Sequence, residues 1–282
     1  MTAFITVKED TLSTSADKIP HRDWALILGA SSGFGEAVSL ELARTGFNIF
    51  GVHLDRKGTL GNVERIKELI KAMGREAIFF NVNAADAKQR HEVLHEIQKT
   101  LHAAPGTSVK VVLHSLAFGT LKPFIHENGS ETVNKTQIDM TMDVMANSLV
   151  YWVQDLSHRK LIGHGARIYA MTSAGSSRVW QTYGAVSAAK CALESHIRQL
   201  ALELAPKGIT ANAILAGVTD TPALRKIPGA EHMVKVASKK NPSGRLTTPR
   251  DVAQAIAALC LPETQWITGN TIRVDGGENI VE

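Results

Sequence analysis

Three residues in the second half of the chain, Tyr183, Lys190 and Ser173, carry groups suited to acid–base chemistry. Tyr183 and Lys190 are seven residues apart in a segment with helical periodicity, which predicts that they share one helix face, two turns apart. Hydride transfer needs a proton donor beside the oxygen that gains charge, and a tyrosine can serve when a neighbouring ammonium group favours its ionised form. We predict a catalytic centre at Tyr183 and Lys190. The alternative is that Tyr183 and Lys190 are ordinary helix residues.

A glycine-rich segment at residues 29–35 follows a short apolar run and precedes a helical pattern. Glycines let the backbone turn sharply and approach a pyrophosphate, which the N-terminus of the following helix attracts. The motif by itself is weak, because a plain Gly/Ser turn has the same composition. Its place at the first strand–helix turn predicts a dinucleotide site. The cofactor contacts expected in this turn are Gly29, Ser31, Ser32, Gly33, Phe34 and Gly35.

The end of the second expected strand bears on the choice between NADH and NADPH. A carboxylate there hydrogen-bonds the ribose hydroxyls, whereas Arg or Lys accommodates a 2′-phosphate. His53 stands at the usual acidic position, and Arg56 and Lys57 follow closely. We therefore predict NADPH as the cofactor, with Arg56 beside its phosphate. Asp55 keeps NADH open as the alternative.

Strand-like and helix-like segments alternate along the chain. Strands are predicted at residues 24–28, 48–53, 77–82, 109–114, 167–172, 210–215 and 270–274. Helices are predicted at residues 36–44, 63–73, 86–101, 138–161, 183–204 and 249–260. Apolar strands separated by helices of this length predict an α/β fold with a single doubly wound, Rossmann-type parallel sheet and helices on both of its faces.

No linker or internal repeat divides the chain, so we expect one catalytic domain over residues 23–282, preceded by an N-terminal extension at 1–22. Residues 218–245 fit neither periodicity and contain three prolines. Long excursions of this kind often serve as lids, and we predict a substrate lid here.

Composition excludes several classes of function. The net charge is only +4 and the basic residues are scattered, so nucleic-acid binding is not expected. No apolar run approaches the roughly 20 residues of a membrane span, and the N-terminus lacks the build of a signal peptide. Cys191 and Cys260 are predicted to be buried free thiols, which fits a reducing compartment. We therefore predict a cytoplasmic protein without a membrane segment.

The segment from His91 to His95 reads HExxH, a spacing that in zinc proteases places two imidazoles on one helix face. No third ligand is evident. Leu94, Ile97 and Leu101 supply the apolar stripe of this helix, so both histidines can face water. We predict no metal site.

Residues 25–277 resemble the short-chain dehydrogenase/reductase family. Beyond the glycine-rich turn, the resemblance rests on Asn83-Ala84, on Ser115-Leu116-Ala117, on the segment 212–221 and on Asp275-Gly-Gly277. It implies that Lys190 holds the ribose hydroxyls of the cofactor. The further cofactor contacts that it implies are Asn83, Ala84, Ser115, Leu116, Ala117, Gly217, Val218 and Thr221.

The spacing of Tyr183 resembles one branch of that family. Carbonyl-reducing members carry Tyr-x3-Lys, but Val186 stands at that tyrosine position here. Tyr-x6-Lys resembles the enoyl-[acyl-carrier-protein] reductases, as does the segment 114–118. Segments 172–183 and 219–246 resemble the NADPH-using type first described in Bacillus.

Two further positions bear on the choice between carbonyl reduction and enoyl reduction. Met145 stands where carbonyl-reducing members have a catalytic Asn, although Asn147 is near. Ser173, seventeen residues before Lys190, matches the catalytic serine of carbonyl reducers, and the resemblance implies that it belongs to the catalytic centre. Many enoyl reductases of the main type have a tyrosine there. The Bacillus-like type also has serine at this place.

The resemblance thus implies an enoyl-thioester reductase of fatty-acid synthesis. NADPH would deliver hydride to the β-carbon while Tyr183 assists at the enolate oxygen. The implied partners are an enoyl thioester of acyl-carrier-protein or coenzyme A, and the implied assembly is a homotetramer. One alternative is a carbonyl or hydroxysteroid oxidoreductase of the same family. Another is a nucleotide-binding regulatory protein that has lost catalysis.

Overall fold

The computed structural model describes residues 23–281, so the predicted extension at 1–22 lies outside the described residues. Seven strands form one sheet in the order β3-β2-β1-β4-β5-β6-β7, and every pairing is parallel. The strands are β1 (Trp24–Leu28), β2 (Asn48–His53), β3 (Ala77–Asn81), β4 (Val109–His114), β5 (Ile162–Ser173), β6 (Thr210–Ala216) and β7 (Thr271–Val274). This confirms the doubly wound Rossmann-type sheet.

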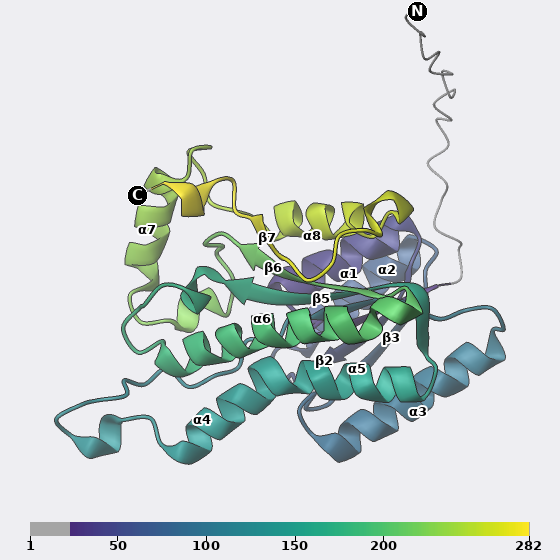
Figure 1. Cartoon of the computed structure of the whole chain (residues 1–282), viewed down its shortest axis with the longest axis horizontal. Coiled ribbons are helices and arrows are strands. Elements are labelled where there is room, and N and C mark those ends of the chain that lie inside the picture. Colours follow the sequence, from purple (N-terminus) through teal and green to yellow (C-terminus); the bar gives the residue numbers. More distant parts are fainter. Residues whose placement is uncertain (1–22, 282) are drawn as a thin grey trace, which may run out of the picture.

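Helices cover both faces of the sheet (Figure 1). One face carries α1 (Gly33–Thr45), α2 (Leu60–Ala72) and α8 (Pro249–Ala258). The other carries α3 (Ala87–Ala103), α4 (Lys135–Met142), α5 (Ser148–His158) and α6 (Gly184–Leu204). Strands buried on both sides are mostly apolar, which explains the uninterrupted apolar run of β1. In β6 the run is broken by Thr210 and Asn212, which are buried as well.

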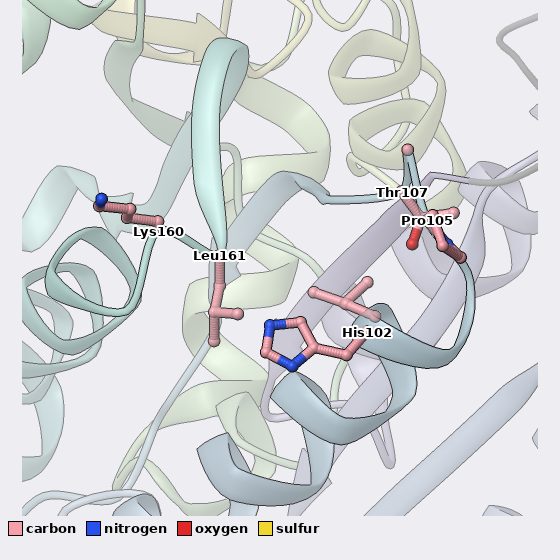
Figure 2. Close-up of a pocket in the computed structure, with 7 residues that line it drawn as sticks. His102, Pro105, Thr107, Lys160 and Leu161 are labelled. Carbon is pink, nitrogen blue, oxygen red and sulfur yellow. The ribbon is translucent and has the colours of Figure 1, made fainter.

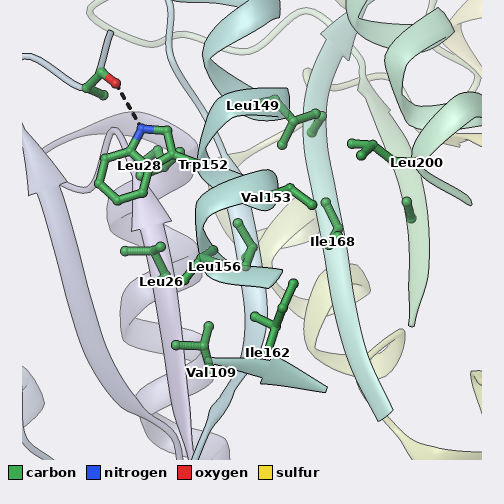
Figure 3. Packing of buried hydrophobic residues seen from close by; sticks show 14 of the residues in the cluster. Leu26, Leu28, Val109, Leu149, Trp152, Val153, Leu156, Ile162, Ile168 and Leu200 are labelled. Carbon is green, nitrogen blue, oxygen red and sulfur yellow. Dashed lines mark hydrogen bonds between the residues drawn. The ribbon is translucent and has the colours of Figure 1, made fainter. Parts of the chain in front are cut away.

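Side chains of β1 alternate between the two hydrophobic layers. Leu26 and Leu28 pack with the layer of α3, α5 and α6, whereas Ala25 and Ile27 pack with that of α1, α2 and α8. In the first layer, Trp152 of α5 is fully buried and its indole N–H donates to the Ala84 carbonyl at 2.8 Å (Figure 3). This bond satisfies the polar atom of a large buried ring.

The predicted helix at 138–161 is present as helical backbone from Lys135 to His158, but it is not α-helical throughout. A π-helical segment, Asp143–Asn147, separates α4 from α5. Ser148 follows this segment, and its hydroxyl donates to the Val144 carbonyl at 2.8 Å. The same hydroxyl lies 2.9 Å from the Nε2 of His114 at the end of β4. Periodicity does not show such an insertion, because it depends on contacts with β4.

The excursion at 218–245 contains a helix that sequence periodicity missed, α7 (Ala230–Lys240). Its apolar residues Ala230, Met233, Val234 and Ala237 have helical spacing, but the stripe spans only two turns and only Ala237 is buried. The remaining predicted helices and strands are present, with ends shifted by a few residues.

Cys191 and Cys260 are both free, as expected, but Cys191 is exposed and the prediction that it is buried was wrong. It lies on the outer side of α6, where its thiol contacts the Ser176 carbonyl at 2.9 Å. Within residues 23–281, no helix combines the length and apolar character needed to cross a membrane.

Candidate active site

The glycine-rich turn joins β1 to α1 at the carboxyl edge of the sheet. Gly29 and Gly33 have φ values of 94° and 57°, in the left-handed region that favours glycine. A Cβ on Gly35 would collide with the Gly29 carbonyl oxygen, and a Cβ on Gly29 would collide with the Ser115 carbonyl oxygen. Ser32 is the N-cap of α1 but its side chain does not cap the helix. The first-turn N–H groups therefore remain available to an anion, and the turn fits a dinucleotide pyrophosphate.

The segment after β6 lies against this turn. A Cβ on Gly33 would be 3.5 Å from the Thr221 methyl group. Gly217 is enclosed by Thr247 and Glu278, and the Val218 N–H donates to the Glu278 carboxylate at 2.9 Å. Gly217, Val218 and Thr221 are thus brought to the same edge as residues 29–35. Ser115, Leu116 and Ala117 follow β4 at this edge too.

At the end of β2, the Asp55 carboxylate lies 3.0 Å from the His53 ring. Burial alone raises the pKa of this carboxyl, but hydrogen bonds from Thr59, Ser31 and His53 lower it overall. Asp55 therefore faces the glycine-rich turn as a carboxylate. Arg56 is exposed at the following turn.

Asn83 and Ala84 follow β3. The Asn83 backbone N–H donates to Gln89 of α3 at 2.7 Å, and Ala84 is buried. Asp86 caps α3 as predicted, because its carboxylate accepts from the Gln89 N–H at 2.8 Å.

Tyr183 is the N-cap residue of α6 rather than its first helical residue. The helix thus begins one residue later than predicted. The Tyr183 ring packs against Gly175, where a Cβ would be 2.5 Å from the edge of that ring. The Ser173 hydroxyl is buried without an ordinary hydrogen-bond partner among the described residues, and it lies beside Tyr183.

Burial raises the pKa of Tyr183, and Ser173 opposes this effect. Lys190 is not among the groups that shift it, contrary to the expectation of a neighbouring ammonium group. The reason is that the Lys190 Nζ donates to the Met171 carbonyl at 2.7 Å. Tyr183 is thus a neutral hydroxyl in this structure, the protonated form that a proton donor requires.

Lys190 is 6% exposed in the interior of α6. Burial lowers its pKa to about 8, and the Glu194 carboxylate opposes this shift. Glu194 is one helical turn further along and accepts from the Thr172 hydroxyl at 2.6 Å. Glu194 was not predicted as a site residue, although its i+4 spacing from Lys190 was a usable signal.

Val186 occupies the tyrosine position of Tyr-x3-Lys and is 4% exposed. It packs with Met145 around Gly119, where a Cβ would be under 3 Å from either side chain. The Asn147 Oδ1 accepts from the Nε2–H of His196 at 3.1 Å, so the Asn147 side chain is engaged by α6. The position of the carbonyl-reducing tyrosine therefore holds a packed aliphatic side chain.

Comparisons with known proteins agree with this geometry. A family model described as enoyl-(acyl carrier protein) reductase matches residues 29–279. The chain belongs to this branch of the short-chain dehydrogenases/reductases. It is 28% identical to the enoyl-[acyl-carrier-protein] reductase [NADH] of Aquifex aeolicus over 77% of each chain. It is also 30% identical to a tropinone reductase homologue of Arabidopsis thaliana over 89% of each chain.

A solved structure of the enoyl-[acyl-carrier-protein] reductase (NADH) from Aquifex aeolicus has the same fold, with a TM-score of 0.78. The match covers 92% of this chain and 97% of that one, at 24% identity. Membership of this oxidoreductase family explains why the glycine turn, Tyr183 and Lys190 occur together. It does not separate reduction of a carbon–carbon double bond from reduction of a carbonyl, because relatives of both kinds match.

His114, the last residue of β4, is fully buried. Burial lowers its pKa to about 3, so the ring is neutral. Its Nε2 contacts Ser148 at 2.9 Å, while its Nδ1 has no partner among the described residues. His114 therefore links β4 to the π-helical segment and carries no charge.

Two features outside the site remain. A cavity of about 260 Å³, lined by Leu101, His102, Lys160 and Leu161 among others, lies at the amino ends of β4 and β5 (Figure 2). The candidate site follows the carboxyl ends of the strands, so this cavity is not part of it. His91 and His95 are both exposed, and residues 23–281 contain no group of three His, Cys, Asp or Glu side chains that could hold a metal.

Proposed function

We propose that this protein is an enoyl-thioester reductase of fatty-acid synthesis. The observation that carries the proposal is the place of the tyrosine at the start of α6. The hydroxyl is at position 183, and an aliphatic side chain stands at position 186. Tyr183 faces Ser173 with a neutral hydroxyl, while Val186 is packed into the core where a carbonyl reducer needs its tyrosine. The proton donor is therefore displaced toward the N-terminal side of α6.

This displacement suits the chemistry of an enoyl thioester. Hydride addition at the β-carbon places the negative charge on the thioester oxygen, several bonds from the carbon that is reduced. In carbonyl reduction the charge appears on the oxygen attached to the reduced carbon itself. A donor for enoyl reduction must therefore lie farther from the hydride source.

We propose NADPH as the cofactor. When bound, it supplies the hydride. The residues that would hold it are those of the glycine-rich turn, Lys190, the segments at 83–84, 115–117 and 217–221, and Arg56 at the 2′-phosphate. Asp55 is the feature that favours NADH, because its carboxylate already faces Ser31.

In this mechanism the Tyr183 hydroxyl donates a hydrogen bond to the thioester oxygen and stabilises the enolate. Ser173, with no ordinary hydrogen-bond partner among the described residues, is free to orient the Tyr183 hydroxyl or the substrate. Lys190 would leave the Met171 carbonyl to hold the ribose, and its charge would then lie closer to Tyr183. Residues 218–245 would form the lid that excludes water.

An acyl substrate is supported by the apolar surroundings of Tyr183. Leu116, Leu121 and Met140 belong with Tyr183 to the partly buried margin of one hydrophobic layer. The Phe124 ring packs on Gly184, directly after Tyr183, and remains 54% exposed. We propose that acyl-carrier-protein or coenzyme A presents the thioester here. We further propose a cytoplasmic location and a homotetrameric assembly.

The second candidate is a carbonyl or hydroxysteroid oxidoreductase. Ser173 and the similarity to a tropinone reductase homologue favour it. It requires a tyrosine that reaches the oxygen on the reduced carbon.

Reduction of a crotonyl thioester tests the proposal, with NADPH and NADH supplied separately. We expect turnover with NADPH, and a loss of about 100-fold or more in kcat for Tyr183→Phe because the oxyanion loses its donor. Tyr151→Phe is the matched control, since Tyr151 lies on α5 at the surface beside Arg90. Turnover of ketones without turnover of the crotonyl thioester, or full activity of Tyr183→Phe, would contradict the proposal. A preference for NADH would overturn the cofactor assignment alone.

A further inference from the structure

The lid helix α7 is thinly attached to the rest of the molecule. Ala237 is its one fully buried residue, and Val236 is 46% exposed. At its C-terminal end, Asn241 donates to the Asp275 carbonyl at 2.8 Å. An element with so little buried apolar surface opens locally at low free-energy cost. Its position therefore depends on a few specific contacts.

Trp180 makes those contacts at the N-terminal end of α7. Its indole N–H donates to the Pro228 carbonyl at 3.0 Å. Its ring stacks on His232, with centroids 6.5 Å apart and planes 23° apart. Gly229 has a φ of 78°, and a Cβ there would be 3.2 Å from the Trp180 ring. Trp180 thus contacts Pro228, Gly229 and His232 at the start of α7.

The backbone of Trp180 is tied to Tyr183. The Trp180 carbonyl accepts from the Tyr183 N–H at 3.1 Å. Between them, Thr182 has a φ of 64°, a conformation that a β-branched residue rarely adopts, and its buried hydroxyl has no partner among the described residues. Surrounding contacts must hold such a turn in place.

We propose that Trp180 is a positioning residue that couples closure of the lid to the placement of Tyr183. Opening α7 breaks the hydrogen bond to Pro228 and the stack on His232. The freed Trp180 then releases the strained turn that fixes Tyr183 at the start of α6. Coupling of this kind is reciprocal, so loosening the turn also loosens the lid. The catalytic part of this inference rests on the proposed function.

Hydrogen exchange of the full chain with NADPH tests the coupling without any substrate. Trp180→Phe keeps a ring but removes the donor to Pro228, and we expect exchange in α7 to rise about fivefold, as for one lost hydrogen bond. His232→Ala alters only an exposed side chain of the lid. We expect it to speed exchange at residues 181–187 as well as in α7. Faster exchange confined to α7, or no change in either region, overturns the coupling.

Kinetics with the crotonyl thioester supply the second readout. For Trp180→Phe we expect kcat to fall about tenfold at saturating NADPH, while the dissociation constant of NADPH stays unchanged. Val179→Ala is the matched control, because Val179 is next to Trp180 in the chain and is 96% exposed. A change in NADPH affinity alone would contradict a role for Trp180 at Tyr183. If the wild-type chain does not reduce the thioester, the proposed function fails while the exchange result still decides the coupling.

Discussion

Lys190 holds an ammonium group inside α6, and its proton controls what the candidate site can do. Burial lowers its pKa to about 8, whereas an exposed lysine keeps its proton to about 10.5. A neutral Lys190 cannot support charge on Tyr183 or bind the ribose as a cation. We expect kcat/KM for NADPH to fall as the pH rises through about 8.

Glu194 sets where that fall occurs, since its carboxylate raises the pKa of Lys190. For Glu194→Gln we expect the alkaline limb of the pH profile to move down by roughly one pH unit. Glu203→Gln, an exposed change on the same helix, is the control. An unmoved limb would show that Lys190 does not govern it.

The protonation of Lys190 also affects stability, but stability rises with pH where activity falls. Between about pH 8 and pH 10.5 the unfolded chain binds the proton that the folded chain has lost. The contribution of Lys190 to the free energy of unfolding therefore rises with pH over this window. Denaturation measured across it separates a loss of activity from a loss of fold.

The glycine-rich turn between β1 and α1 is the proposed binding surface for the pyrophosphate of the cofactor. Gly35→Ala would push a methyl group into the Gly29 carbonyl, so we expect NADPH binding to weaken at least tenfold and the melting temperature to fall. Gly61→Ala in α2 is the control, because a Cβ there meets nothing within 4 Å. That change should stabilise the protein by about 0.5–1 kcal/mol. Normal NADPH affinity in Gly35→Ala would rule out the turn as the pyrophosphate site.

The π-helical segment that joins α4 to α5 also shapes the site. Ser148 and His114 hold the π-helical segment against β4, and Met145 of that segment packs beside Val186. The segment thereby fills the position of the carbonyl-reducing tyrosine from one side. The proposed preference for enoyl chemistry therefore rests on three elements, β4, the π-helical segment and α6, rather than on Tyr183 alone.

For the whole molecule, the edge of the sheet at β7 is the surface that suggests assembly. Trp266 is 95% exposed and Leu261 is 45% exposed on the segment that leads into this edge strand. Large exposed apolar groups beside an unpaired strand edge favour contact with another copy of the chain. We expect sedimentation to report a tetramer, and Trp266→Ser to shift it toward smaller species. A monomeric wild-type chain at micromolar concentration would contradict the proposed assembly.

The alternation of strands and helices, the parallel sheet and the glycine turn can be predicted from the sequence, because hydrophobic periodicity and glycine spacing are local properties. The sequence also contains the unusual spacing of Tyr183, Val186 and Lys190. Three features are visible only in the folded chain: Tyr183 stands at the N-cap position of α6, Lys190 donates to the Met171 carbonyl, and α7 packs on Trp180. These features depend on contacts between segments far apart in the chain, and no local pattern records them.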